Sequence, residues 1–292
     1  MATATKLKLH TMLGNYPITK PLKNGAVRSD LVDFDFVEVK VANNLFKQVV
    51  RDAKYDVAEL AIVTYLQAKA YGKPYVLLPA VIVSRGQHHT IAYNPQRGAL
   101  KPSELEGKRV GVRAYTVTTG TWVRGILASD YGLDINKVEW ITFEDPHVAE
   151  YVDTTERAPK DKKILQMLVD GELDAVLGET SNDPKLRPLF PDPAAEAAIW
   201  YARRGVVPVN HLVVVTEQLA KSHPDVVSGI YDLLKQNKDR MGPAASPDLL
   251  PFGIEANRKP LELIVDYAFQ QALIPRRYAV EDLFDETTRG LK

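Results

Sequence analysis

Short apolar segments typical of strands alternate along this chain with amphipathic segments typical of helices. Residues 6–13 and 31–39 show the alternation of apolar and polar side chains expected of half-buried strands. Residues 75–85 form the near-continuous apolar run of a strand buried on both faces. Residues 64–72 and 221–238 have apolar side chains at helical spacing. This order of elements predicts an α/β protein whose sheets contain parallel strands and carry helices on their faces.

The alternating pattern falls into two blocks, and a late strand at residues 206–217 returns to the first block. We therefore expect two lobes, each a mixed sheet flanked by helices. Lobe one takes residues 1–92 and 205–292, and lobe two takes residues 93–204, with a ligand cleft between the lobes. A chain of 292 residues is long enough for two such cores.

Composition removes several classes of function. Lys plus Arg and Asp plus Glu number 37 each, so the net charge is zero and nothing favours a nucleic-acid partner. No stretch approaches the roughly 20 apolar residues of a membrane-spanning helix. The absence of cysteine excludes disulfides and thiolate chemistry. Residues 1–13 have no apolar leader pattern, so a cytoplasmic location is expected. A homo-oligomer is left open.

Three local motifs occur in an order and spacing that resemble the type II periplasmic-binding-protein fold. They are the run SELEGKRVGV at residues 103–112, the run GELDAV at residues 171–176 and the helix start SHPDVV at residues 222–227. Each motif only turns a helix into a strand or begins a helix. Together they indicate the fold and carry no functional information.

Six further segments carry a more specific resemblance, at residues 59–66, 84–93, 110–127, 205–211, 251–262 and 275–284. In these segments the chain most resembles the 4,5-dihydroxyphthalate decarboxylases. This resemblance implies a cytoplasmic carboxy-lyase that needs no organic cofactor. It would release carbon dioxide from a hydroxylated aromatic carboxylate, as in the conversion of 4,5-dihydroxyphthalate to protocatechuate. It also implies that the first loop, with Asn15 and Tyr16, contacts the ligand.

Two arginines are the candidates for binding the carboxylates of such a substrate. Arg85 and Arg113 each directly follow an apolar strand. Ligands of open α/β sheets bind at the carboxyl ends of strands, and a planar guanidinium matches a carboxylate in bidentate fashion. A surface arginine or a salt bridge between lobes is the alternative interpretation of each. Glu179 also follows a strand and is a weaker candidate for a site residue at the carboxyl ends of the strands.

Acid–base chemistry points to His211 and His89, because histidine titrates nearest to neutral pH. Glu59, at the end of the third strand, is a candidate acceptor for a phenolic proton. If residues 84–93 form a strand, His88 and His89 point to opposite faces, and only one of them faces the ligand. Hydrogen-bonded structural histidines and an ordinary capping glutamate are the alternatives.

Helix starts offer a further anion site. Thr116, Thr118 and Thr119 precede the helix that contains Trp122, and the free N–H groups at the start of that helix favour a carboxylate. Asn43 or Asn44 is expected to cap a helix of the first block in the same way.

Three aromatic side chains are candidates to stack on a substrate ring, with core packing as the alternative: Tyr16, Tyr115 and Trp122. We expect no metal site, because no closely spaced ligand motif is present. The alternative to an enzyme is a solute-binding protein or ligand sensor that closes on an aromatic or other organic anion without catalysis.

Overall fold

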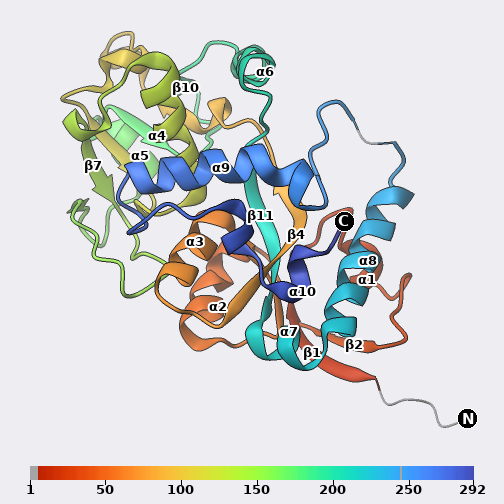
Figure 1. Ribbon diagram of the computed structural model, residues 1–292. Coiled ribbons are helices and arrows are strands. Elements are labelled where there is room, and N and C mark those ends of the chain that lie inside the picture. The colour runs from red at the N-terminus through yellow and green to blue at the C-terminus, as the bar shows by residue number, and fades with distance from the viewer. Residues whose placement is uncertain (1–5, 244) are drawn as a thin grey trace, which may run out of the picture. The chain divides into compact units, whose positions relative to one another are not determined.

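The computed structural model describes residues 6–243 and 245–292. The expectation that residues 1–13 carry no leader pattern therefore falls partly on residues 1–5, which lie outside the described residues. The chain forms two compact units (Figure 1), unit 1 from Met1–Arg85 with Val209–Lys292, and unit 2 from Gly86–Pro208. Lobe two was expected to begin at residue 93, whereas unit 2 begins at Gly86. Residues 91–93 belong to unit 2 because they pair with strands of its sheet.

Unit 1 is built on a five-stranded sheet with the order β2-β1-β3-β11-β4. Its strands are β1 (Leu7–Met12), β2 (Val32–Phe36), β3 (Val57–Ala61), β4 (Tyr75–Ser84) and β11 (Val209–Thr216). Strand β1 is parallel to β2 and to β3, whereas β11 is antiparallel to both of its neighbours. The sheet is therefore mixed, with the late strand inserted beside the strands of the first block.

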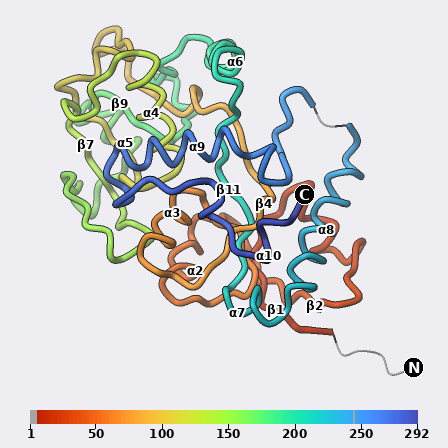
Figure 2. Tube along the Cα trace, in the orientation of Figure 1, coloured from red at the N-terminus to blue at the C-terminus, as the bar shows by residue number. Residues whose placement is uncertain are grey.

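Helices cover both faces of this sheet, with α2 and α3 on one side and α8 on the other (Figure 1). The helical segments are α1 (Lys20–Lys23), η1 (Ala42–Leu45), α2 (Phe46–Asp52), α3 (Ile62–Ala70), α7 (Glu217–Ser222), α8 (Pro224–Arg240), α9 (Ile254–Gln270), η6 (Val280–Leu283) and α10 (Glu286–Arg289). The C-terminal segment returns to unit 1, where α10 packs against α8 and β4 (Figure 2).

Strand β11 shows why the sheet needs cover on both faces. Val213 and Val215 belong to the core that α8 closes with Val227, Ile230 and Leu234. Leu212 and Val214 point to the opposite face and are also fully buried. A strand buried on both faces has an almost continuous apolar sequence, as the run at residues 212–215 has.

Unit 2 contains a six-stranded sheet with the order β10-β5-β9-β6-β7-β8. Its strands are β5 (Ile91–Tyr93), β6 (Arg109–Val112), β7 (Glu139–Thr142), β8 (Glu156–Arg157), β9 (Ala175–Leu177) and β10 (Arg187–Pro188). Its helical segments are η2 (His88–Thr90), η3 (Pro95–Arg97), η4 (Pro102–Leu105), α4 (Thr118–Tyr131), η5 (Ile135–Lys137), α5 (Ile164–Asp170) and α6 (Pro193–Arg204). Strand β6 is parallel to β7 and to β9, so the ends of these three strands share one edge.

Two local expectations were wrong. Asn43 and Asn44 do not cap a helix through their side chains, because both lie inside the 3₁₀ turn η1 and α2 begins only at Phe46. His88 and His89 are not on a strand, because they form the 3₁₀ turn η2 before β5. The strand rule of opposite faces therefore does not apply to this histidine pair.

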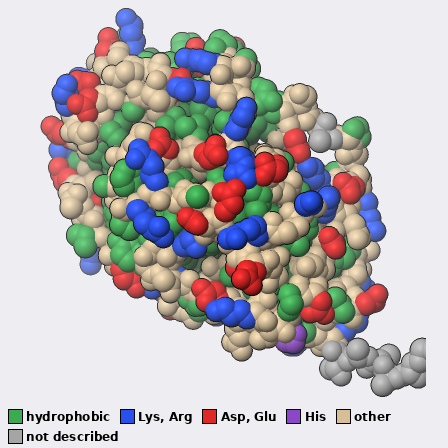
Figure 3. Space-filling view, in the orientation of Figure 1, with side chains coloured by type: hydrophobic (Ala, Val, Ile, Leu, Met, Phe, Trp, Pro, Cys, Tyr) green, Lys and Arg blue, Asp and Glu red, His purple; other side chains and the backbone are tan. Residues whose placement is uncertain are grey.

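The surface agrees with the balanced composition. On the face drawn in Figure 3, basic and acidic side chains are interspersed. Among the described residues, every helix is too short or too polar to cross a membrane.

A buried aspartate joins two helices of unit 2. The Asp130 side chain is 1% exposed and accepts hydrogen bonds from Trp200 Nε1 at 3.0 Å and from Arg204 Nη2 at 2.9 Å. Burial raises the pKa of Asp130, but hydrogen bonds from Ser129, Trp200 and Arg204 outweigh burial and leave the pKa below its ordinary value. The ionised form is therefore the one that stabilises unit 2.

We predict that Asp130→Asn lowers the free energy of unfolding of unit 2 by about 1–3 kcal/mol at neutral pH. Because the folded pKa is lowered, this contribution is present above the ordinary pKa of aspartate, about 3.9, and is lost as the pH falls through the folded value. Denaturant unfolding followed by Trp fluorescence at neutral and acidic pH measures the difference. The exposed Asp161→Asn serves as the control. If the free energies of unfolding of wild type and Asp130→Asn differed by the same amount at every pH, the prediction would be contradicted.

Candidate functional site

The centre of the candidate site in unit 1 is Glu59, a carboxylate with no solvent exposure. It lies in β3, a strand on which every residue is buried. In the antiparallel pairing with β11, Glu59 is opposite Val213, and His211 is opposite Ala61. Because side chains two residues apart share a face of a strand, the side chains of Glu59 and His211 are diagonal neighbours on one face.

Three groups, two from the loop after β1 and one from β11, contact the Glu59 carboxylate. Its Oε2 accepts a hydrogen bond from the backbone N–H of Gly14 at 2.5 Å. Its Oε1 accepts a hydrogen bond from the Tyr16 hydroxyl at 2.8 Å and lies 2.8 Å from Nδ1 of His211. A buried carboxylate needs such partners, since an unpaired charge in a protein interior is strongly destabilising.

The contact between Glu59 and Nδ1 of His211 selects one tautomer when Glu59 is ionised. An ionised carboxylate can only accept, so Nδ1 then carries the proton and Nε2 is the nitrogen that can exchange one. The side chain of His211 is 15% exposed. Phe46 packs edge-on against its ring, with centroids 5.2 Å apart. The imidazole is therefore held from two sides and is still accessible.

Tyr16 stays a phenol in this environment. Burial raises the pKa of Tyr16, and the charge of Glu59 and the hydrogen bond to it raise that pKa further, whereas the Arg85 guanidinium opposes the shift. Lys23 lies near the same carboxylate and donates to the Leu13 carbonyl at 2.8 Å. Burial lowers the pKa of Lys23, and Glu59 opposes this. Arg85 itself is exposed and directly follows β4.

In unit 2, charged side chains gather at the shared edge of β6, β7 and β9. Arg113, which follows β6, has its Nε 3.7 Å from a carboxylate oxygen of Glu144, which comes after β7. Glu179 comes after β9, and burial raises its pKa, with Arg113 opposing the shift and Glu144 adding to it. The predicted carboxylate ligand Arg113 is therefore already placed beside two acidic side chains.

Helix α4 begins at Thr118, so Thr118 and Thr119 lie in its first turn and do not precede it, and its N-cap Val117 makes no side-chain capping hydrogen bond. Thr118 is buried and Thr119 is half-buried. Trp122 has no exposed surface, so it is a core residue and not an exposed platform for a substrate ring. Thr116 is likewise buried in the loop that leads into α4.

Tyr115 has a partner that sequence reasoning did not anticipate. The guanidinium carbon of Arg124 lies 3.9 Å from the Tyr115 ring centroid, and Arg124 Nη2 donates to the Tyr115 carbonyl at 2.5 Å. Arg124 is fully buried on α4 and also lies over the ring of Trp140. The sequence signal was a lone arginine among apolar helix positions, which points to a buried cation that shapes the loop after β6.

The other predicted residues lie in different surroundings. Asn15 is exposed beside Tyr16, and Asn43 is half-buried in η1. His89 is exposed on η2, whereas His88 is buried with its ring edge-on to Phe190. Gly14 was missed as a site residue, although it belongs to a Gly-Asn-Tyr-Pro turn directly after a strand. Among the described residues, no group of three or more His, Asp or Glu side chains is arranged to hold a metal ion.

Comparison with solved structures defines the class of fold. The alkanesulfonate-binding protein SsuA from Xanthomonas axonopodis pv. citri matches with a TM-score of 0.61 and 14% identity, covering 98% of this chain and 99% of that one. The periplasmic aliphatic sulphonate binding protein SsuA from Escherichia coli matches with a TM-score of 0.59 and 12% identity, over 96% of this chain and 98% of that one. The desulfurization enzyme DSZB matches with a TM-score of 0.58 and 13% identity, over 96% and 97%. The expected periplasmic-binding-protein fold is confirmed.

Comparison with characterised sequences defines the family. A 4,5-dihydroxyphthalate decarboxylase from Comamonas testosteroni is 33% identical over 251 residues, which are 80% of this chain and 76% of the relative. The enzyme of the same name from Pseudomonas putida is 35% identical over 213 residues, which are 67% of this chain and 82% of the relative. No family model matches the chain. The chain belongs to the 4,5-dihydroxyphthalate decarboxylase family, and the resemblance noted in the sequence is confirmed.

The close contact at Gly14 leads to a test of the Glu59 network. A Cβ at Gly14 would lie 2.5 Å from the Tyr16 ring and 2.7 Å from Glu59 Oε2. We predict that Gly14→Ala destabilises unit 1 by about 1–3 kcal/mol, because the added methyl group overpacks the site. Thermal unfolding measures the loss. Gly290→Ala is the matched control, since a Cβ there meets nothing within 4 Å. Equal melting temperatures for both variants would show that the loop moves freely away from Glu59.

Proposed function

We propose that this chain is a carboxy-lyase that removes carbon dioxide from a hydroxylated aromatic carboxylate, with 4,5-dihydroxyphthalate as the first candidate substrate. Membership of the decarboxylase family supports the reaction class. The observation that carries the proposal is the buried Glu59 carboxylate, which fixes His211 with Nε2 available for proton transfer. We place the activity in the cytoplasm, and fractionation of the host cell tests that location.

The chemistry needs one proton delivered to a ring carbon. In 4,5-dihydroxyphthalate each carboxylate lies para to a hydroxyl group. When that hydroxyl loses its proton, its electron pair conjugates to the carbon that bears the carboxylate. Protonation of this carbon gives a dienone, and the carbon–carbon bond to the carboxylate then breaks. Carbon dioxide leaves, and the bonding electron pair restores the aromatic ring.

We assign His211 as the acid that protonates the ring carbon. Its protonated form carries hydrogens on both nitrogens, and the Glu59 carboxylate at 2.8 Å stabilises that charge until Nε2 gives up its proton. Glu59 is thus a positioning residue, because its oxygens are occupied by Gly14, Tyr16 and His211. Tyr16 holds Glu59 from the other side. His89 stays a sequence prediction for a second acid–base role.

Carboxylate binding is proposed for two arginines, one in each unit. Arg85 directly follows β4 and is an exposed residue at the carboxyl end of that strand. Arg113 is the corresponding candidate in unit 2, where a ligand carboxylate would compete with Glu144. Asn15, Asn43, Tyr115, Thr118 and Thr119 stay predictions as substrate-binding residues.

The competing function is a binding protein or sensor that does no chemistry. It is favoured by the fold, which the chain shares with sulfonate-binding proteins. Incubation with a panel of hydroxylated phthalates and benzoates, with measurement of released carbon dioxide, separates the two. Release from one substrate supports the enzyme. Tight binding of a panel member without release from any of them would establish the binding protein instead.

Replacement of the acid is the sharpest test of mechanism. We predict that His211→Gln lowers kcat by about 10²–10⁴-fold while substrate affinity changes little, because glutamine keeps a hydrogen-bonding group and has no titrating proton. Carbon dioxide release and equilibrium binding measure the two quantities. The exposed His223→Gln is the control and should keep wild-type turnover. Turnover of His211→Gln within a few-fold of wild type would remove His211 from the mechanism.

The arginine assignment predicts a difference between charged and neutral ligands. Arg85→Ala should weaken binding of a dicarboxylate by about 2–4 kcal/mol, because a ligand charge loses its partner. A neutral analogue without carboxylates should bind nearly as well as before. Isothermal titration calorimetry on both ligands measures the effect, with Arg113→Ala tested in parallel. Equal loss for both ligands would assign Arg85 a structural role.

A further inference from the structure

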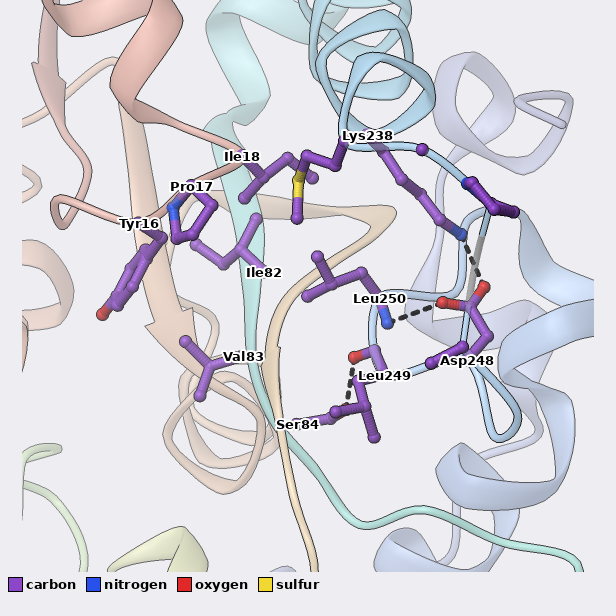
Figure 4. Close-up of a pocket in the computed structure, with 14 residues that line it drawn as sticks. Tyr16, Pro17, Ile18, Ile82, Val83, Ser84, Lys238, Asp248, Leu249 and Leu250 are labelled. Carbon is purple, nitrogen blue, oxygen red and sulfur yellow. Dashed lines mark hydrogen bonds and ion pairs between the residues drawn. The ribbon is translucent and has the colours of Figure 1, made fainter.

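Unit 1 contains a pocket of about 400 Å³ that the proposed chemistry does not use. It lies between the loop after β1, the carboxyl end of β4, the end of α8 and the segment before α9 (Figure 4). Pockets that bind small molecules have volumes from roughly 300 Å³ upwards. This pocket is therefore large enough for a monocyclic compound.

The walls of the pocket are almost entirely apolar. Its apolar lining residues include Ile18, Ile82, Val83, Met241 and Leu249. Met241 is 48% exposed and Leu249 is 45% exposed, so two large apolar side chains face solvent at the same pocket. Clustered exposed apolar surface on a folded protein commonly marks a binding site.

The charged groups of the pocket, Lys238 and Asp248, lie together, whereas the Ser84 hydroxyl lies elsewhere in the lining and donates to the Leu249 carbonyl (Figure 4). Lys238 Nζ lies 2.5 Å from Asp248 Oδ2, and the backbone N–H of Leu250 donates to Asp248 Oδ1 at 2.9 Å. The positive and negative charges of Lys238 and Asp248 balance each other. Each carboxylate oxygen has a second lone pair, so Asp248 can still accept a hydrogen bond from a ligand hydroxyl.

This charge balance excludes the proposed substrate from the pocket. A dicarboxylate would bring two negative charges to apolar walls and to a lysine that is already paired with Asp248. Burial of unpaired charges is strongly unfavourable. An uncharged ligand with one hydrogen-bond donor meets both the apolar walls and the Asp248 carboxylate.

An aromatic ring fits the wall better than an open chain. The Tyr16 ring, Pro17 and the thioether of Met241 all border the pocket. Aromatic rings and methionine sulfur make favourable contacts with a further aromatic ring.

We propose that this pocket is a second binding site of unit 1, specific for a small uncharged aromatic molecule that carries one hydroxyl group. The hydroxyl donates to Asp248, and the ring lies among Val83, Ile82 and Tyr16. Tyr16 directs its own hydroxyl away from the pocket (Figure 4), and that hydroxyl donates to Glu59. Tyr16 is thus shared by the pocket, which it lines, and by the network of Glu59 and His211, to which its hydroxyl donates.

Direct binding of p-cresol tests the proposal without any measurement of turnover, so its outcome is independent of the decarboxylase assignment. Calorimetry and ligand-observed NMR with wild-type protein should show saturable binding at one site. Val83→Phe fills the pocket and should weaken p-cresol binding about tenfold or more. Val152→Phe, at a side chain that is 77% exposed in unit 2, is the matched control and should bind as wild type does.

A second variant tests the charged pair. Asp248→Asn leaves Lys238 without its carboxylate partner, so the pocket should lose affinity for p-cresol and gain affinity for benzoate, which wild type is expected to exclude. This exchange of preference is not expected from a general loss of structure. Absence of saturable p-cresol binding to wild type would overturn the proposal. So would equal binding by Val83→Phe and Val152→Phe, or an Asp248→Asn variant that excludes benzoate as wild type does.

Discussion

The burial of the Glu59 carboxylate is the constraint on which the arrangement of the site in unit 1 depends. A fully buried charge is tolerated only where several donors surround it. Here Gly14, Tyr16 and His211 supply those contacts from the loop after β1 and from β11. The carboxylate therefore joins three chain segments, and the orientation of each is tied to the other two.

Buried charges that need surrounding partners also shape helix α4 of unit 2, which carries one buried cation and one buried anion. Arg124 is buried midway along this helix, where it lies against the faces of Tyr115 and Trp140 and donates to the Tyr115 carbonyl. Asp130 is buried near its end, where Trp200 and Arg204 surround it. One helix thus fixes the loop after β6 through a cation and fixes α6 through an anion. A purely apolar helix face would pack but would not orient these neighbours.

The sequence predicted the elements well where the signal was local. Apolar runs gave the strands, because a strand buried on both faces must be apolar throughout, and the positions of Arg85 and Arg113 after strands followed from that. Prediction failed where short turns replaced regular elements, as at Asn43 and at His88. The environment of Glu59 was beyond local pattern, because its partners are 43, 45 and 152 residues away in the chain. Charge burial of this kind is decided by tertiary structure.

The fold by itself does not distinguish a binder from a catalyst, since sulfonate-binding proteins share it. Binding an anion requires cations and N–H donors at strand and helix ends, and both units have candidates for these. Proton transfer to carbon requires in addition a titratable group whose reactive atom is held in place. A histidine held at Nδ1 by a buried carboxylate meets that requirement, and the cost of burying Glu59 is hard to explain in a protein that only binds. The position of His211 on a strand, and not on a loop, keeps Nε2 fixed relative to the sheet. This rigidity, together with membership of a decarboxylase family, is the physical argument for catalysis by this chain.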